Sequence, residues 1–338
     1  MAAGEPEAES EVPEEAQTSD DSEKLNGEVA EDSLGPPNSQ VEEDLIDLIH
    51  GKALTVQEAF RITSATRTQL IIIVGAVGSG KTTLIASLFH CFQEGPFAGY
   101  LFAGSDTLLG FDQRCHQART VSGRSTADTE RTKFGTEHQL LHLQVRTEDL
   151  NSPITHVLMS DLSGEHFESA KDSVSECRDL GLIQRADHFV LLVDGEKLAK
   201  PEHRQSAKNK AIMMLRSCLD AGQLDQRSLV YILFSKWDLI ETDKNKQQGI
   251  EFVGQVETSI EQQFESRVGR LSFFKVAARR EKGDLPLGYG LDKPFSSWIE
   301  DTSAKILPAK ILMQERGGIS EFDCYFRRTL PQLFREEN

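Results

Sequence analysis

The sequence predicts an α/β protein in which helices cover both faces of a mostly parallel β-sheet. Three observations carry this prediction. Short apolar runs typical of strands alternate with longer segments of helical character. A glycine-rich stretch joins the first strand-like run to a helical segment, as expected for a phosphate-binding loop. The polar link between the runs at residues 138–145 and 154–159, which contains Asn151, Ser152 and Pro153, is too short for a crossover and therefore predicts an antiparallel hairpin within the sheet.

The elements follow from these patterns in chain order. The expected strands are residues 70–74, 100–103, 138–145, 154–159, 188–193, 229–234 and 271–276. The expected helices are residues 81–92, 108–119, 173–181, 201–221 and 246–268.

Two further helical regions are expected to flank these elements. Residues 41–67 are expected to form one or two small helices before the first strand, and residues 294–335 a small helical C-terminal cap. The apolar anchors of the cap would be Phe295, Trp298, Ile299, Phe322, Tyr325 and Phe326.

The charge of the chain is concentrated in an N-terminal tail. The 338 residues carry a formal net charge of −17, and residues 1–44 hold 15 acidic residues against one basic residue, Lys24. This segment has no aromatic residue and is rich in Glu, Ser, Pro and Gly, so we expect an acidic, disordered tail. The nearly neutral remainder argues against a nucleic-acid partner held by phosphate neutralisation.

Membrane and secretory roles are not expected either. The longest apolar runs are too short to span a bilayer, and the N-terminus resembles neither a secretory signal nor a transit peptide. Five cysteines without a C-x-x-C pair suit a reducing cytosol and indicate neither a disulfide framework nor a zinc site. We therefore expect a cytoplasmic protein.

The strongest motif is the glycine-rich stretch at residues 75–82, which reads G-A-V-G-S-G-K-T. Glycines let successive backbone N–H groups point at a phosphate, and the following helix adds a partial positive charge at its N-terminus. Lys81 would reach the β- and γ-phosphates, Thr82 would bind Mg²⁺, and Thr83 would donate towards the α-phosphate. The competing interpretation is an ordinary strand–helix turn. The candidate nucleotide-binding residues of this loop are Gly75, Gly78, Ser79, Gly80, Lys81, Thr82 and Thr83.

A second phosphate element follows the expected strand at residues 154–159 and reads D-L-S-G-E. Asp161 would hold Mg²⁺ through water, and the backbone N–H of Gly164 would meet the γ-phosphate. A simple turn after a strand is the alternative, because such turns often contain Asp and Gly.

The base-reading element is S-K-W-D at residues 235–238, after the expected strand at 229–234. With it, the set of motifs resembles a Ras-like, TRAFAC-class P-loop GTPase, whose guanine signature is [NT]-K-x-D. The resemblance implies that Asp238 accepts hydrogen bonds from guanine N1–H and the exocyclic amine, and that the stem of Lys236 lies over the base. Ser235 departs from the usual Asn or Thr and, being shorter than Asn, is expected to tie this loop to the phosphate loop less well.

One strand later, F-F-K-V-A-A-R resembles the last guanine element of the same class. The resemblance implies that a backbone N–H meets guanine O6 there. Ala277 and Ala278 both fit, and Ala278 is favoured.

The first switch is expected in an insert at about residues 97–137. By resemblance, a Thr binds Mg²⁺ there; Thr132 and Thr136 are the candidates, and Thr132 is favoured. Arg131, or else Arg124, would supply positive charge to the transition state, although a solvated basic loop is the favoured interpretation for any one of these arginines. After Gly164, Glu165 stands where such enzymes often have Gln, which predicts slow intrinsic hydrolysis. The adjacent His166 is either a water-positioning group or a surface histidine.

The nearest named resemblance is to the bacterial double-GTPase type of GTPase domain, over roughly residues 50–305. It rests on the lead-in L-T-V-Q-E-A-F-R-I-T, the phosphate loop, the extended insert, D-L-S-G-E and S-K-W-D. It implies a Ras-like GTPase domain at residues 45–305, a C-terminal helical extension at 306–338, and a GTP-controlled switch in a multi-component system. The implied partners are GTP, GDP and protein effectors or a hydrolysis-stimulating protein.

Three functions compete at this point. The leading one is a GTPase that uses Lys81, Mg²⁺, Arg131 and a water near Glu165 to hydrolyse GTP slowly. The second is a GTP-binding adaptor with little or no hydrolysis. The third, an ATPase or nucleotide kinase, is disfavoured by S-K-W-D.

Overall fold

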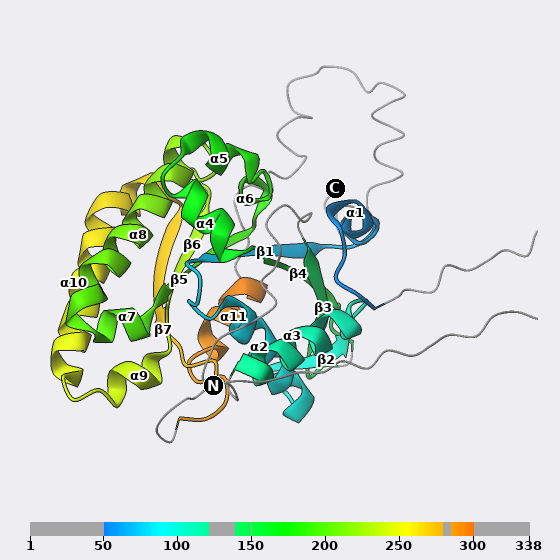
Figure 1. The fold of residues 1–338 in the computed structure, drawn as a ribbon. Coiled ribbons are helices and arrows are strands. Elements are labelled where there is room, and N and C mark those ends of the chain that lie inside the picture. The colour runs from blue at the N-terminus through cyan, green and yellow to red at the C-terminus, as the bar shows by residue number, and fades with distance from the viewer. Residues whose placement is uncertain (1–50, 122–138, 150, 280–284, 301–338) are drawn as a thin grey trace, which may run out of the picture. The chain divides into compact units, whose positions relative to one another are not determined.

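The computed structural model describes residues 51–121, 139–149, 151–279 and 285–300. Within these residues one seven-stranded sheet has the order β2-β3-β4-β1-β5-β6-β7 (Figure 1). The strands are β1 (Thr68–Gly75), β2 (Tyr100–Gly104), β3 (Leu140–Thr147), β4 (Thr155–Asp161), β5 (His188–Asp194), β6 (Leu229–Ser235) and β7 (Arg270–Lys275).

Among the described strands, β3 alone runs against the others. β1 pairs in parallel with β4 and β5, and β5, β6 and β7 continue the parallel series. β3 is antiparallel to both of its neighbours, β2 and β4. The prediction of a mostly parallel sheet with one antiparallel strand is therefore confirmed.

Helices surround the sheet. The described helices are α1 (Val56–Ala65), α2 (Lys81–Glu94), α3 (Leu108–Val121), α4 (Gly164–Ala170), α5 (Val174–Asp179), α6 (Leu182–Arg185), α7 (Gly195–Ala199), α8 (Pro201–Asp220), α9 (Trp237–Glu241), α10 (Lys246–Phe264) and α11 (Asp292–Glu300). A 3₁₀ turn, Glu265–Arg267, follows α10. The sequence did not predict α4, α6, α7 and α9, since helices of four to seven residues are too short to show a helical period.

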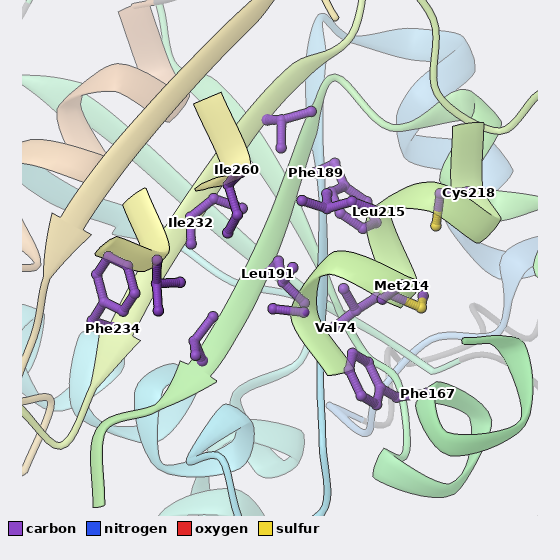
Figure 2. Packing of buried hydrophobic residues seen from close by; sticks show 14 of the residues in the cluster. Val74, Phe167, Phe189, Leu191, Met214, Leu215, Cys218, Ile232, Phe234 and Ile260 are labelled. Carbon is purple, nitrogen blue, oxygen red and sulfur yellow. The ribbon is translucent and has the colours of Figure 1, made fainter. Parts of the chain in front are cut away.

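Two apolar cores lie on opposite faces of the sheet because strand side chains alternate in direction. In β1, Ile72 and Val74 belong to one core, whereas Ile71 and Ile73 belong to the other. Figure 2 shows part of the first core, where Val74 and Phe167 lie close to Met214 of α8. The second core contains residues of α2, α3 and α11. The expectation of helices on both faces is thus confirmed.

The elements that flank the core agree with the expectation where the structure describes them. α1 begins with a capping box between Thr55 and Glu58, which satisfies two backbone donors at the helix start. α11 buries Phe295 and Trp298, two of the predicted cap anchors. Phe322, Tyr325 and Phe326 lie outside the described residues, as do the tail at 1–44 and the extension at 306–338, so the domain boundaries stay predictions.

The helices of the described segments include none that is both long and apolar enough to cross a membrane.

Candidate nucleotide-binding site

The phosphate loop occupies the turn between β1 and α2. Gly78 and Gly80 have φ angles of +78° and +93°, in the left-handed region that favours glycine. Gly75 is enclosed, because a Cβ there would lie 2.6 Å from Ser79 Oγ and 2.9 Å from the Leu192 carbonyl oxygen. The glycines of the motif are therefore required by the backbone path and by the neighbouring strand β5.

Lys81 opens α2 and is buried, with 7% of its surface exposed. Its ammonium donates to the carbonyl oxygens of Gly75 at 2.7 Å and Ala76 at 3.2 Å. The side chain therefore folds back over the loop that its own helix follows. Thr82 and Thr83 come next, in the first turn of α2.

The D-L-S-G-E motif lies against this loop. Asp161 ends β4, where its backbone pairs in register with Ile73 of the neighbouring β1. Gly164 begins α4, and a Cβ at this position would lie 2.6 Å from the Val77 backbone nitrogen and 2.7 Å from its Cα. Only glycine allows the start of α4 to approach the phosphate loop so closely.

Ser163 caps α4 and engages the histidine of the motif. Its hydroxyl oxygen accepts from the His166 backbone N–H at 3.3 Å, and it hydrogen-bonds His166 Nδ1 at 2.9 Å. His166 therefore has a structural role at the helix start, and Glu165 lies in the same first turn.

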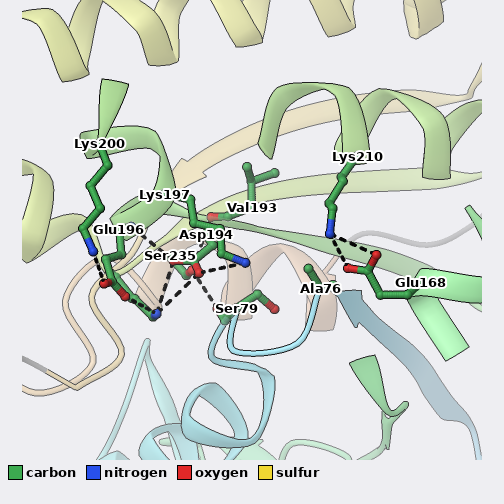
Figure 3. A network of polar contacts seen from close by, with 12 residues as sticks. Ala76, Ser79, Glu168, Val193, Asp194, Glu196, Lys197, Lys200, Lys210 and Ser235 are labelled. Carbon is green, nitrogen blue, oxygen red and sulfur yellow. Dashed lines mark hydrogen bonds and ion pairs between the residues drawn. The ribbon is translucent and has the colours of Figure 1, made fainter. Parts of the chain in front are cut away.

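The base-reading motif begins where β6 ends. The Ser235 hydroxyl donates to the Ser79 carbonyl oxygen at 2.7 Å and lies 3.2 Å from the Val193 carbonyl oxygen (Figure 3). Serine is therefore long enough to tie this loop to the phosphate loop, contrary to the weaker tie that its length suggested. Asp238 is buried, with 1% of its surface exposed, in the first turn of α9.

Lys236 lies in a network of charges that the sequence analysis missed. Its ammonium lies 3.0 Å from Glu196 Oε2 and 3.2 Å from Asp194 Oδ1. Burial alone would lower the pKa of Lys236, but these two carboxylates outweigh it and hold the pKa above its ordinary value. The only sequence signal for this network was the V-D-G-E at residues 193–196, directly after a predicted strand.

The pKa of Glu196 is lowered to about 2, first by the hydrogen bond from Lys200 and then by that from Lys236. Lys200 Nζ lies 2.7 Å from Glu196 Oε1. Glu196 is therefore ionised throughout the physiological pH range.

The loop after β7 adjoins the base-reading motif. The Trp237 backbone N–H donates to the Val276 carbonyl at 3.1 Å. The Ala277 N–H donates to the Tyr289 carbonyl at 3.0 Å, so it already has an acceptor within the protein. Of the two alanines proposed for guanine O6, this geometry favours Ala278.

A cavity of about 280 Å³ lies beside the phosphate loop, between α4, α8 and the end of β5. Phe167, Leu192 and Ala207 give it apolar walls, and Asp194 contributes a polar wall. It therefore adjoins both the phosphate loop and the charge network around Lys236.

The structure thus brings most of the predicted residues to one edge of the sheet. The ends of β1, β4, β5 and β6 carry the phosphate loop, Asp161, Asp194 and Ser235, as expected for ligand sites in parallel sheets. Thr132, Thr136, Arg131 and Arg124 lie outside the described residues, so the first switch stays a prediction.

A strand–loop–helix phosphate loop, a close glycine at α4 and a base-reading loop tied to the phosphate loop define a P-loop GTPase domain. The sequence model of the Double-GTPase 2 family matches residues 69–299. This match covers well over half of the chain, and the chain belongs to that family.

Some solved structures are similar to this chain at low sequence identity. A chain of the signal recognition particle receptor SRb-GTP/SRX complex from Chaetomium thermophilum is 15% identical, with 69% of this chain and 97% of that chain covered and a TM-score of 0.38. Translation elongation factor SelB from Methanococcus maripaludis is 12% identical, with 70% and 35% covered and a TM-score of 0.36. The Ski7 GTPase-like domain from S. cerevisiae is 14% identical, with 63% and 44% covered and a TM-score of 0.33. No curated protein matches the sequence.

Proposed function

We propose that this protein binds GTP with Mg²⁺, hydrolyses it slowly to GDP and phosphate, and acts as a nucleotide-controlled switch in a multi-component system. The observation that carries the proposal is the hydrogen bond from Ser235 to the Ser79 carbonyl. It joins a motif suited to guanine to a loop suited to phosphates, although the two residues are 156 positions apart. If S-K-W-D were a surface turn that matched the guanine motif by chance, a contact with the phosphate loop would not be expected.

The phosphate end would act through Lys81 and backbone N–H groups. The ammonium would exchange its carbonyl partners for the β- and γ-phosphates, where charge-assisted hydrogen bonds are stronger. The N-terminus of α2 adds its dipole to this attraction. The backbone N–H of Gly164 would reach the γ-phosphate, which its lack of a side chain permits.

The residues beside the loop fit a magnesium ion. Thr82 and Asp161 carry oxygen atoms, the ligands that Mg²⁺ prefers, and the pairing of Asp161 with Ile73 brings the end of β4 beside β1 just before the loop begins. Thr82 and Asp161, with Thr132 from the first switch, would hold the ion. The ion would neutralise charge on the β- and γ-phosphates when bound.

The base end would act through three groups. Asp238 would accept two hydrogen bonds from guanine, the Lys236 stem would cover the ring, and the Ala278 N–H would donate to O6. Adenine would be rejected, because it presents an acceptor where guanine presents the N1–H donor.

Hydrolysis would be slow without help from another protein. Glu165 can accept a hydrogen bond from the attacking water but cannot donate one to the transition state, and its charge would lie near the γ-phosphate. Arg131, or an arginine from a stimulating partner, would supply the missing positive charge. We propose a cytoplasmic setting with protein effectors, an acidic tail at 1–44, a GTPase domain at 45–305 and an extension at 306–338.

Glu165 also supports a second candidate, a GTP-binding adaptor with little or no hydrolysis. Single-turnover hydrolysis of GTP, with and without a cell extract, separates the two candidates. Turnover in either condition supports the GTPase, and retained binding without turnover in both supports the adaptor.

The binding claim is tested by titrating fluorescent GTP and GDP with and without Mg²⁺, in competition with ATP. Asp238→Asn should shift the preference from guanosine to xanthosine triphosphate, because xanthine replaces the exocyclic amine with a carbonyl. Asp112→Asn, an exposed position on α3, is the matched control and should change nothing. A preference for ATP, or no magnesium-dependent affinity for guanosine nucleotides, would overturn the proposal.

A further inference from the structure

Two carboxylates hold the ammonium group of Lys236. Glu196 Oε2 lies 3.0 Å from Lys236 Nζ, and the Asp194 oxygens Oδ1 and Oδ2 lie 3.2 Å and 3.5 Å from it. The Lys236 side chain is 21% exposed and that of Asp194 only 4% exposed, so this ion pair is largely shielded from water. Charge-assisted hydrogen bonds in such a setting fix a side chain more firmly than surface ion pairs do.

The backbone places both carboxylates next to the base-reading motif. Asp194 ends β5 and caps α7, where its side chain accepts from the Glu196 N–H at 3.1 Å. Between them, Gly195 packs so tightly on the Ser235 carbonyl that a Cβ there would collide with it. The start of α7 is therefore fixed against the backbone of Ser235 and Lys236.

Lys236 itself has an uncommon backbone conformation. Its φ angle is +50°, one of only two positive values among the described residues other than glycine. A left-handed conformation is unfavourable for a residue that carries a Cβ. Here it turns the chain from β6 into α9, and the side chain reaches Asp194 and Glu196 at the start of α7.

The charges alternate along this network. Lys200 pairs with Glu196, Glu196 with Lys236, Lys236 with Asp194, and Asp194 with Lys197 at distances from 2.7 to 3.9 Å. Each acid lies between two lysines, so removing an outer lysine leaves the contacts to Lys236 in place. Removing Glu196 or Asp194 takes one of those contacts away.

We propose that Asp194 and Glu196 are positioning residues for guanine recognition, which hold the Lys236 ammonium away from the base so that only its aliphatic stem faces the ring. The inference rests on the proposed function of this site. An ammonium released from the carboxylates would reach N7, an acceptor that guanine and adenine share. The two carboxylates therefore contribute both to guanine affinity and to the discrimination against adenine.

Glu196 is the better position for the test. Its side chain is 40% exposed, so Glu196→Gln threatens the fold less than a change at Asp194, which is buried and caps a helix. We expect Glu196→Gln to weaken GDP binding about threefold to tenfold, the usual worth of one charge-assisted hydrogen bond at a partly exposed site. The ratio of GDP to ADP affinity should fall as well, which a loss of stability alone would not cause.

Two controls isolate the effect. Lys200→Gln removes the outer partner of Glu196 and should leave GDP affinity unchanged, as should Glu202→Gln in the exposed first turn of α8. In a Lys236→Met background, Glu196→Gln should no longer change the affinity ratio, because its effect passes through Lys236.

The outcomes separate this inference from the function on which it rests. If the unchanged protein binds GDP and Glu196→Gln binds it equally well and with the same selectivity, the positioning role is wrong while the function stands. An effect of Glu196→Gln that persists in Lys236→Met overturns the role too. If the unchanged protein does not bind GDP at all, both the function and the positioning role are wrong.

Discussion

The two ends of the proposed nucleotide-binding site are built in different ways. The phosphate end is made of consecutive residues between β1 and α2, and its geometry is set by backbone conformation at Gly78 and Gly80. The base end is assembled from three separate segments: the end of β5, the loop after β6 and the loop after β7. Side-chain contacts such as Ser235 to Ser79 hold it together.

This difference predicts how strongly a single substitution should affect binding at each end. A backbone-built loop depends on the absence of side chains and on one cation, so single changes there should have large effects. A network of side chains spreads its energy over several contacts, so the loss of one contact should cost less. The following four experiments test this contrast, from the largest expected effect to the smallest.

Lys81→Ala should have the largest effect. It removes the cation of the phosphate end, and the loss of its charge-assisted hydrogen bonds to the phosphates should cost about 3 kcal/mol of binding free energy. GTP binding should therefore weaken about 100-fold in a fluorescence titration. Lys208→Ala on α8 is the matched control. Undiminished affinity in Lys81→Ala would show that the loop does not bind the triphosphate.

Gly164→Ala should destabilise the protein by about 2 kcal/mol, the usual cost of overpacking a site that cannot relax. The added Cβ would lie 2.6 Å from the Val77 backbone nitrogen, and backbone atoms cannot move aside as a flexible side chain can. Urea unfolding measures the change. Gly254→Ala is the contrast, because α10 has open space there and alanine should stabilise the helix by up to about 1 kcal/mol. Equal stability of the two variants would contradict the close approach of α4 to the phosphate loop.

Ser235→Ala should cost about 1 kcal/mol of stability, because a buried hydroxyl donor is lost while the Ser79 carbonyl keeps its place. The affinity for GTP should fall by less than in Lys81→Ala, about fivefold to tenfold, since the base end retains its other contacts. Thermal unfolding and the same titration measure both effects, with Ser64→Ala on the exposed side of α1 as the control. A loss of affinity as large as that of Lys81→Ala would mean that the base end depends on a single contact as strongly as the phosphate end does.

The smallest expected effect is a dependence of stability on pH at Glu196. The pKa of this carboxyl is lowered from 4.5 to about 2 by Lys200 and Lys236. Its contribution to stability is therefore present above about pH 4.5 and is lost as the pH falls through 2. Screening by water limits it to about 0.5 kcal/mol. Urea unfolding at pH 7 and at pH 2.5 should show a larger loss for the unchanged protein than for Glu196→Gln. Equal losses of stability in the two proteins would show that Glu196 does not contribute to stability through this network.

The same contrast explains what the sequence could predict. The phosphate loop was readable because its chemistry lies in a short, continuous pattern that must follow a strand and open a helix. Asp194 and Glu196 were missed because two acidic residues after a strand look identical to a solvated turn. Only the pairing of β5 with β6 reveals that they lie beside Lys236.

The fold shows the same limit. The central strands were predictable because they are short, continuous apolar runs, buried on both faces as in β5. The long helices were predictable because a period of 3.6 residues repeats often enough in them to be seen. The short helices α4, α7 and α9 offer no such repeat, yet each begins within one or two residues of a predicted binding or network residue. The caps of α4 and α7 are local contacts, from Ser163 to the His166 N–H and from Asp194 to the Glu196 N–H. Such Ser and Asp caps also occur in turns that no helix follows, so they did not identify these helices on their own.

The order of strands in the sheet also fixes a length. β5 lies between β1, which leads into the phosphate loop, and β6, which leads into the base-reading loop. Neighbouring strands are about 4.8 Å apart, so the two loops leave the sheet about 10 Å from each other. In the proposed complex, β5 therefore sets the distance that the sugar of the nucleotide would bridge, and a free base or a bare triphosphate would bind only one of the two loops.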